Sequence, residues 1–157
     1  MKKTVVLSLV AMGVSVAAAK PWADRLNELF AVDSSVCTMA PADCGQANGL
    51  VTFSGRLDDL SEIRGFVSPP YAAGDFTFLL RFNGESFRPT SYVWRPECLL
   101  RTFTNAQWRI ENRLYPVAGE RAAIQETRIV NVYSKPAWMT VTSVLGGGVG
   151  KVAKWGF

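Results

Sequence analysis

The segment from Phe76 to Phe87 constrains the fold more than any other part of this chain. Its first half, FTFLLRF, has an aromatic or leucine residue at every second position. Side chains alternate between the two faces of a β-strand, so this pattern predicts a strand with one apolar face. Asn83 and Gly84 follow, and both tolerate the positive φ angles of a two-residue type I′ turn. We therefore expect a β-hairpin in which the chain from Glu85 onwards pairs back antiparallel.

Further β-like segments follow the same logic. Residues 50–57 alternate, and in residues 108–114 Trp108, Ile110 and Leu114 alternate with charged side chains. Shorter β-rich runs cover residues 98–103, 123–133 and 138–145. Turn signals recur roughly every 8 to 15 residues, which is typical of all-β domains. We predict a mainly β fold, a small antiparallel sandwich or barrel of about seven strands, with an α+β sheet as the alternative.

One helix is predicted near the N-terminus, over residues 21–32. Trp22, Leu26, Leu29 and Phe30 recur at the spacing of one helical face. Such an amphipathic helix needs an apolar surface to cover. We expect it to pack across a sheet of the domain or onto a partner.

The first 19 residues are typical of an export signal. Two lysines precede an apolar run from Thr4 to Val16, and the small residues Ala17-Ala18-Ala19 suit a cleavage site. The run has about 13 apolar or small residues, fewer than the roughly 20 that a spanning helix needs. We predict cleavage after Ala19 and a periplasmic, extracellular or cell-surface location. A retained membrane anchor is the alternative.

Cleavage would remove 19 of the 157 residues and leave 138, the size of one domain. We expect a single β-rich domain over residues 20–145 and a flexible Gly-rich tail over residues 146–157. The mature chain would keep 15 basic residues against 13 acidic ones, with no run of three basic residues. A nucleic-acid-binding protein is expected to show a basic patch or stripe, so we predict no nucleic-acid partner.

The absence of histidine limits the chemistry of this chain. It excludes Ser-His-Asp and Cys-His catalysis and most zinc sites, so we predict no metal and no cofactor. A carboxylate pair, as in glycoside hydrolysis, is the catalytic option that remains. The candidate carboxylates are Asp58, Asp59, Glu62, Asp75, Glu111, Glu120 and Glu126. Their spacing singles out no pair, which favours surface charges and a protein that is not an enzyme.

Three cysteines accompany the export signal. Export favours disulfides, and Cys37 and Cys44 flank a short segment containing Pro41 whose ends can meet. We predict a Cys37–Cys44 disulfide that shapes a loop and leaves Cys98 as a buried thiol. The alternatives pair Cys98 with either of the other two.

Several tryptophans lie where they could form a contact surface. Trp94 and Trp108 are expected in the β core, whereas Trp138 and Trp155 flank the Gly-rich segment. We predict that Trp138, Trp155 and the terminal Phe157 bind a partner. A frayed terminus is the alternative. Trp and Lys also suit a membrane surface, so peripheral membrane contact by the tail is a further role to test.

These observations favour an exported, non-enzymatic envelope or surface protein that binds another protein in a secretion, conjugation or pilus-type assembly. The alternative is a carbohydrate-binding module or a glycan-active enzyme that uses a carboxylate pair. An open sheet edge or a flat apolar patch would favour the assembly protein. Coplanar exposed aromatic rings, or an acidic pair about 5–10 Å apart in a cleft, would favour the glycan protein.

Overall fold

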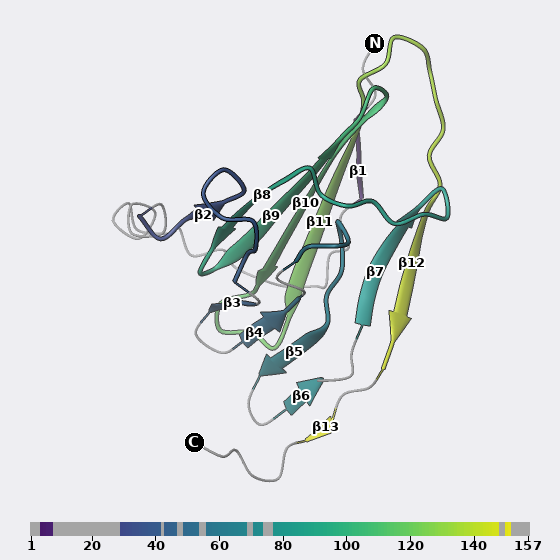
Figure 1. Cartoon of the computed structure of the whole chain (residues 1–157). Helices are drawn as coiled ribbons and strands as arrows, with labels where there is room; N and C mark the ends of the chain where they lie inside the picture. The colour runs from purple at the N-terminus through teal and green to yellow at the C-terminus, as the bar shows by residue number, and fades with distance from the viewer. Residues whose placement is uncertain are drawn as a thin grey trace.

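Antiparallel sheets are the main secondary structure of the described residues (Figure 1). The computed structural model describes residues 4–7, 29–41, 43–46, 49–53, 56–68, 71–73, 77–147 and 150–151. It contains three sheets, of six, five and two strands. The prediction of a mainly β fold is confirmed. Several of the short strands lie in segments that the sequence predicted as loops, so the strands outnumber the seven that were expected.

The six-stranded sheet is the largest and has the order β1-β11-β10-β9-β8-β2. Its strands are β1 (Thr4–Leu7), β2 (Val32–Asp33), β8 (Ser91–Arg95), β9 (Cys98–Thr104), β10 (Trp108–Pro116) and β11 (Ala123–Asn131). Strands β8 to β11 follow one another in the chain and pair as consecutive hairpins. β1, which belongs to the predicted export signal, pairs with β11 from Thr4↔Val130 to Leu7↔Thr127.

The other two sheets come from the chain before and after this meander. The five-stranded sheet has the order β13-β6-β5-β4-β3, and the two-stranded sheet pairs β12 with β7. Their strands are β3 (Asp43–Gln46), β4 (Gly49–Thr52), β5 (Gly65–Ser68), β6 (Tyr71–Ala73), β7 (Thr77–Phe82), β12 (Val141–Gly146) and β13 (Gly150–Lys151). Figure 1 shows β7 and β12 as a narrow ribbon beside the long strands of the largest sheet.

The inner face of β10 carries the core. Trp108, Ile110 and Leu114 are buried as predicted, and the alternation continues through Asn112 and Pro116. Leu114 packs with residues of β3, β4, β8 and β9, whereas Trp108 and Ile110 pack with β7. The five-stranded sheet therefore covers one end of this face, and β7 covers the other end.

The predicted hairpin is correct at its turn and wrong in its pairing. Asn83 and Gly84 have φ angles of 54° and 84°, and Phe82 and Glu85 exchange backbone hydrogen bonds of 2.9 and 3.1 Å. Beyond Glu85 the chain leaves β7, because Phe87 turns into the core and stacks on Phe82 with a centroid distance of 5.6 Å. β7 pairs instead with β12, more than fifty residues later in the chain.

The predicted N-terminal helix is not confirmed. Residues 21–28 lie outside the described residues, and Val32, its predicted last residue, lies in strand β2. Leu29 and Phe30 are exposed rather than packed across a sheet. A two-residue pairing of β2 with β8 thus replaces the end of the predicted helix.

Candidate functional site

Strand β12 lies at an open edge of the described structure. β7 separates it from the other described strands, and β12 is the outermost ribbon on its side of the molecule (Figure 1). No described strand pairs with its outer side. The β12 edge, residues 141–146, is therefore the first candidate for an interaction site.

The opposite edge of β7 is closed, and its partners show which way each backbone group points. Phe78 exchanges backbone hydrogen bonds with Ile63, at 2.8 and 3.0 Å. The Leu80 N–H donates to Ser61 Oγ at 2.7 Å, and the Phe82 N–H donates to the Glu85 carbonyl. Backbone groups alternate in direction along a strand. The backbone groups of the intervening residues 77, 79 and 81 therefore face β12.

The register then identifies the free groups of β12. Gly146, Val144 and Thr142 lie opposite the β7 residues that face β12 and bond to them. The N–H and C=O groups of Val141, Ser143 and Leu145 point to the open side. Over five residues, β12 offers three donors and three acceptors to a further strand.

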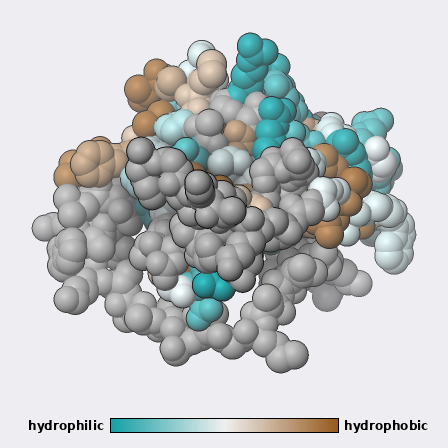
Figure 2. Space-filling model, turned by 90° about the horizontal axis from the view of Figure 1, so that it is seen from below, coloured by the Kyte–Doolittle hydropathy of each residue, from teal (hydrophilic) through white to brown (hydrophobic). Residues whose placement is uncertain are grey.

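Side chains at this edge lack the features that normally protect one. No charged residue occurs between Lys135 and Lys151, whereas natural edge strands often carry charge, Pro or a bulge. Leu145 lies opposite Phe78, on the core-facing side of the ribbon, yet 69% of its surface is exposed. Val144, on the other face, is 43% exposed. Figure 2 shows hydrophobic surface on the side of the molecule where β7 and β12 lie.

Trp138, in the segment that enters β12, is a further exposed apolar side chain. Its side chain is 97% exposed, as expected for a predicted partner-binding residue and unlike a core tryptophan. Its neighbours Ala137 and Met139 pack against the cluster that contains Phe82, so the segment entering β12 is anchored while Trp138 points outward. The other two predicted binding residues, Trp155 and Phe157, lie outside the described residues.

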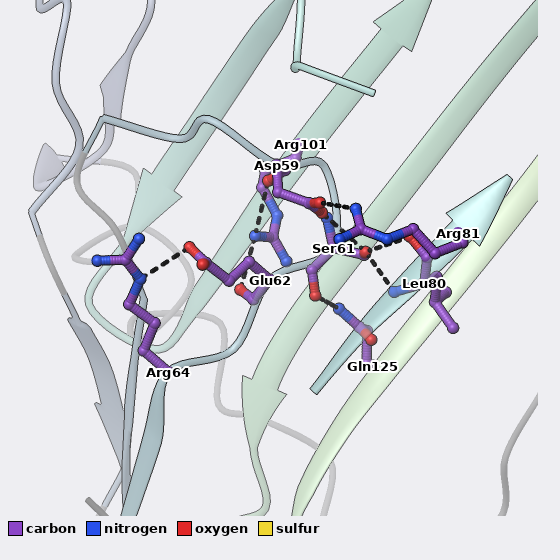
Figure 3. A network of polar contacts seen from close by, with 8 residues as sticks. All are labelled: Asp59, Ser61, Glu62, Arg64, Leu80, Arg81, Arg101 and Gln125. Carbon is purple, nitrogen blue, oxygen red and sulfur yellow. Dashed lines mark hydrogen bonds and ion pairs between the residues drawn. The ribbon is translucent and has the colours of Figure 1, made fainter. Parts of the chain in front are cut away.

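A buried polar network holds the 59–62 loop against the large sheet and positions β7 (Figure 3). Asp59 Oδ1 accepts hydrogen bonds from the Ser61 N–H at 2.8 Å and the Ser61 hydroxyl at 3.0 Å, and its Oδ2 pairs with Arg81 of β7 at 3.2 Å. Gln125 of β11 donates to the Ser61 carbonyl at 2.6 Å. The loop is thereby tied to both β7 and β11.

Arg101 of β9 is the centre of the network and is fully buried. It donates to Asn112 Oδ1 at 2.7 Å and to the carbonyls of Glu62 and Asp59 at 2.9 and 3.4 Å. Asn112 in turn donates to the Thr127 hydroxyl at 2.8 Å. Burial lowers the pKa of the Arg101 guanidinium to about 10, an effect that the Asp59 and Glu62 carboxylates oppose.

This network lies between the apolar cluster around Leu114 and the apolar cluster around Ile110, and its role is structural. Arg101, Asn112 and Thr127 are register partners across β9, β10 and β11, so they form one polar row on the inner face of the sheet. This polar row was not predicted from the sequence. The residue that could have indicated it is Asn112, a polar residue two positions from Ile110 and from Leu114 on the predicted core face.

The predicted Cys37–Cys44 disulfide is not formed. All three thiols are free, with Cys37 exposed and Cys44 and Cys98 buried. Residues 43–46 form β3 rather than a loop, and this strand turns Cys44 into the core, where Sγ lies 3.9 Å from the Leu114 carbonyl. Cys37 lies outside the core on the loop after β2. The burial of Cys98 as a free thiol is confirmed.

Most of the described candidate carboxylates are engaged by other side chains. Among the described ones, five form ion pairs or hydrogen bonds with other side chains: Asp58 with Arg88, Asp59 with Arg81, Glu62 with Arg64, Glu111 with Arg109 and Arg128, and Glu126 with Tyr115. Asp75 lies outside the described residues, and Glu120 is exposed. Within the part of the chain that is described, no group of three metal-ligating side chains occurs.

The other aromatic and apolar features fit a structural role. Trp108 is buried, and Trp94 packs against the core and donates its Nε1–H to the Asp43 carbonyl at 2.6 Å, as expected for core residues.

No helix among the described residues is long and apolar enough to cross a membrane.

Comparison with known proteins gives no further guide to the site. No protein-family model, curated protein or solved structure matches this chain.

Proposed function

We propose that this chain is an exported, non-enzymatic envelope or surface protein that binds a partner protein by strand addition. The β12 edge is the site, and a small sandwich of the three sheets is the scaffold that presents it. In strand addition, main-chain hydrogen bonds give affinity and side-chain pockets give specificity. A secretion, conjugation or pilus-type assembly is the setting that fits such a component.

The exposure of Leu145 on the core-facing side of β12 is the observation that carries this proposal. β7 has buried side chains on this face, at Leu80 and Phe82, whereas the face is uncovered at the end of β12. A strand added beside β12 would satisfy the outward groups of residues 141, 143 and 145 and cover the Leu145 side chain. The partner segment is therefore extended and uncharged, with apolar residues at alternate positions.

The preferred test removes one outward donor without touching the pairing with β7. Ser143→Pro deletes an N–H that points to the open side, and Pro is tolerated on the free side of an edge strand. Ser143→Ala keeps that N–H and is the matched control. A photo-cross-linking amino acid at position 145 should capture the partner in the otherwise unchanged protein and in Ser143→Ala, and capture should be lost in Ser143→Pro.

A second placement of the cross-linker makes the test specific. At position 109, on an exposed side chain of β10, the same group should capture no partner. Equal capture from positions 109 and 145, or unchanged capture in Ser143→Pro while its circular dichroism spectrum matches the control, would contradict strand addition. Cross-linked species of twice the mass of the chain would instead identify a second copy as the partner.

A further inference from the structure

A surface cavity that no residue of β12 lines has the composition of a binding site. It has a volume of about 270 Å³ and lies where three segments meet: the loop after β2, the turn after β4 and the chain that enters β8. The first segment supplies residues 34, 37 and 38, the second residues 56 and 57, and the third residues 88–92. This cavity is independent of the proposed role of β12.

Both charged residues of the cavity wall are basic. Arg56 and Arg88 line it, and no Asp or Glu does. Arg88 has one ion pair, a long contact of 3.9 Å to Asp58, which is not part of the wall. Arg56 makes no ion pair or hydrogen bond with any residue that the structure describes. Two guanidinium groups beside one cavity create a field that attracts an anion.

The remaining polar groups of the wall suit the same ligand. Four residues with hydroxyl groups line the cavity: Ser34, Thr38, Thr90 and Ser91. The Thr90 hydroxyl donates to the Thr102 carbonyl at 3.0 Å, which leaves the other three as donors for a ligand. Hydroxyl donors and guanidinium groups are the usual partners of carboxylate and phosphate oxygens, and arginine can bind them through two parallel hydrogen bonds.

The cavity is built before any ligand arrives. The Tyr92 hydroxyl donates to the Cys37 carbonyl at 2.7 Å, and the Ser34 N–H donates to the Tyr92 carbonyl at 3.2 Å. These bonds fix the 34–38 loop to β8. On the opposite wall, Leu57 is buried with a φ angle of 52°, a left-handed conformation that is strained for a leucine. Such strain persists where the surrounding structure imposes it, often at ligand sites.

We propose that this cavity binds a small molecule bearing an oxyanion, a phosphate or a carboxylate, through Arg56 and Arg88. The volume admits a compact ligand rather than a polymer. The hydroxyl groups orient the oxyanion, and Leu57 and Pro89 supply the apolar part of the wall.

The exposed Cys37 thiol lines the cavity and provides a local reporter. The other two cysteines are buried, so alkylation of the native protein by iodoacetamide should occur at Cys37. Inorganic phosphate should slow this alkylation at least threefold relative to chloride at equal ionic strength. Citrate tested alongside distinguishes a carboxylate site from a phosphate site, because the better ligand protects at lower concentration.

Calorimetric titration with the same two anions completes the test. Arg56→Gln and Arg88→Gln should each weaken binding by roughly tenfold, the effect of losing one charge-assisted hydrogen bond. Arg109→Gln removes the same charge from exposed β10, outside the cavity, and should leave affinity unchanged. Absence of Cys37 protection by both anions, or equal loss of affinity in all three variants, would overturn the proposal.

Discussion

The guanidinium of Arg101 donates a 2.7 Å hydrogen bond to Oδ1 of Asn112, its register partner on the neighbouring strand. Both side chains are fully buried, and no carboxylate hydrogen-bonds to the guanidinium among the described contacts. The positive charge is instead surrounded by the carbonyls of the 59–62 loop. Arg101 thus joins this loop to the sheet, together with Gln125, which donates to the Ser61 carbonyl.

Replacing Arg101 should destabilise the whole domain. Arg101→Met leaves two loop carbonyls without this donor, and Asn112 Oδ1 keeps only the 3.3 Å hydrogen bond from Gln125. We expect this change to lower the free energy of unfolding by about 2–4 kcal/mol. Urea unfolding followed by tryptophan fluorescence measures this loss. Arg109→Met, which removes an exposed partner of Glu111, should cost no more than about 1 kcal/mol. Equal losses in the two variants would show that the network does not hold the loop.

A second prediction concerns backbone strain at the type I′ turn, which we test by comparing Gly84 with a control glycine, Gly146. Gly84 has a φ angle of 84° and open space where a Cβ would lie, so Gly84→Ala is opposed by backbone strain alone. We expect it to lower the free energy of unfolding by about 1 kcal/mol. Gly146, in β12, has equal space and no positive φ. Gly146→Ala should leave the free energy of unfolding unchanged or raise it slightly. Thermal unfolding of both variants and of the unchanged protein measures the difference. A stability loss in Gly146→Ala as large as that in Gly84→Ala would argue against strain at the turn.

The buried thiols predict a loss of stability in alkaline solution. Burial raises the pKa of Cys44 from 9.0 to about 12, and burial also raises the pKa of Cys98. Above pH 9 the unfolded chain releases these protons before the folded protein does, so stability falls as the pH rises toward 12. Arg101, whose pKa is lowered to about 10, contributes in the opposite sense above pH 10. The thiol effect is therefore clearest between pH 9 and 10.

Urea midpoints at pH 8, 9 and 10 check this prediction. The decline with pH should become shallower in a Cys44→Ala, Cys98→Ala variant and should persist in Cys37→Ala, whose thiol is exposed. A decline that is identical in all three proteins would assign the alkaline instability to other groups.

The export signal predicts that the mature chain begins at Lys20. Cleavage would remove β1 and leave the outer side of β11, at residues 127–130, without that strand. Intact-mass measurement of exported protein should show a chain shorter by the first 19 residues. A full-length mass would contradict cleavage and favour either the retained anchor or a β1 strand that stays paired with β11.

The C-terminal segment should contribute more to association than to folding. Of residues 149–157, the described pairing involves only Gly150 and Lys151, opposite Ala72 and Tyr71. We expect deletion of residues 149–157 to shift the midpoint of thermal unfolding by only a few degrees and to abolish partner or membrane association. Unfolding of the truncated chain would show instead that this segment is an ordinary part of the sheet.

The local pattern of the sequence was sufficient to predict the longer strands, among them β7, β10 and β11, and the inner face of β10. Trp108, Ile110 and Leu114 are buried because period-two alternation places them on one side of any strand, whatever its neighbours are. Asn83 and Gly84 form the predicted turn because the φ angles of two residues depend mainly on those residues.

Only the tertiary structure decided which strands pair and which polar groups are buried. β7 pairs with β12 rather than with the chain after its own turn, because Phe87 stacks between Phe82 and Phe103 and draws that chain into the core. Arg101 donates to carbonyls about forty residues away in the chain, which no local pattern reveals. The open β12 edge likewise depends on long-range pairing, because a strand is an edge only by virtue of what the rest of the chain leaves uncovered.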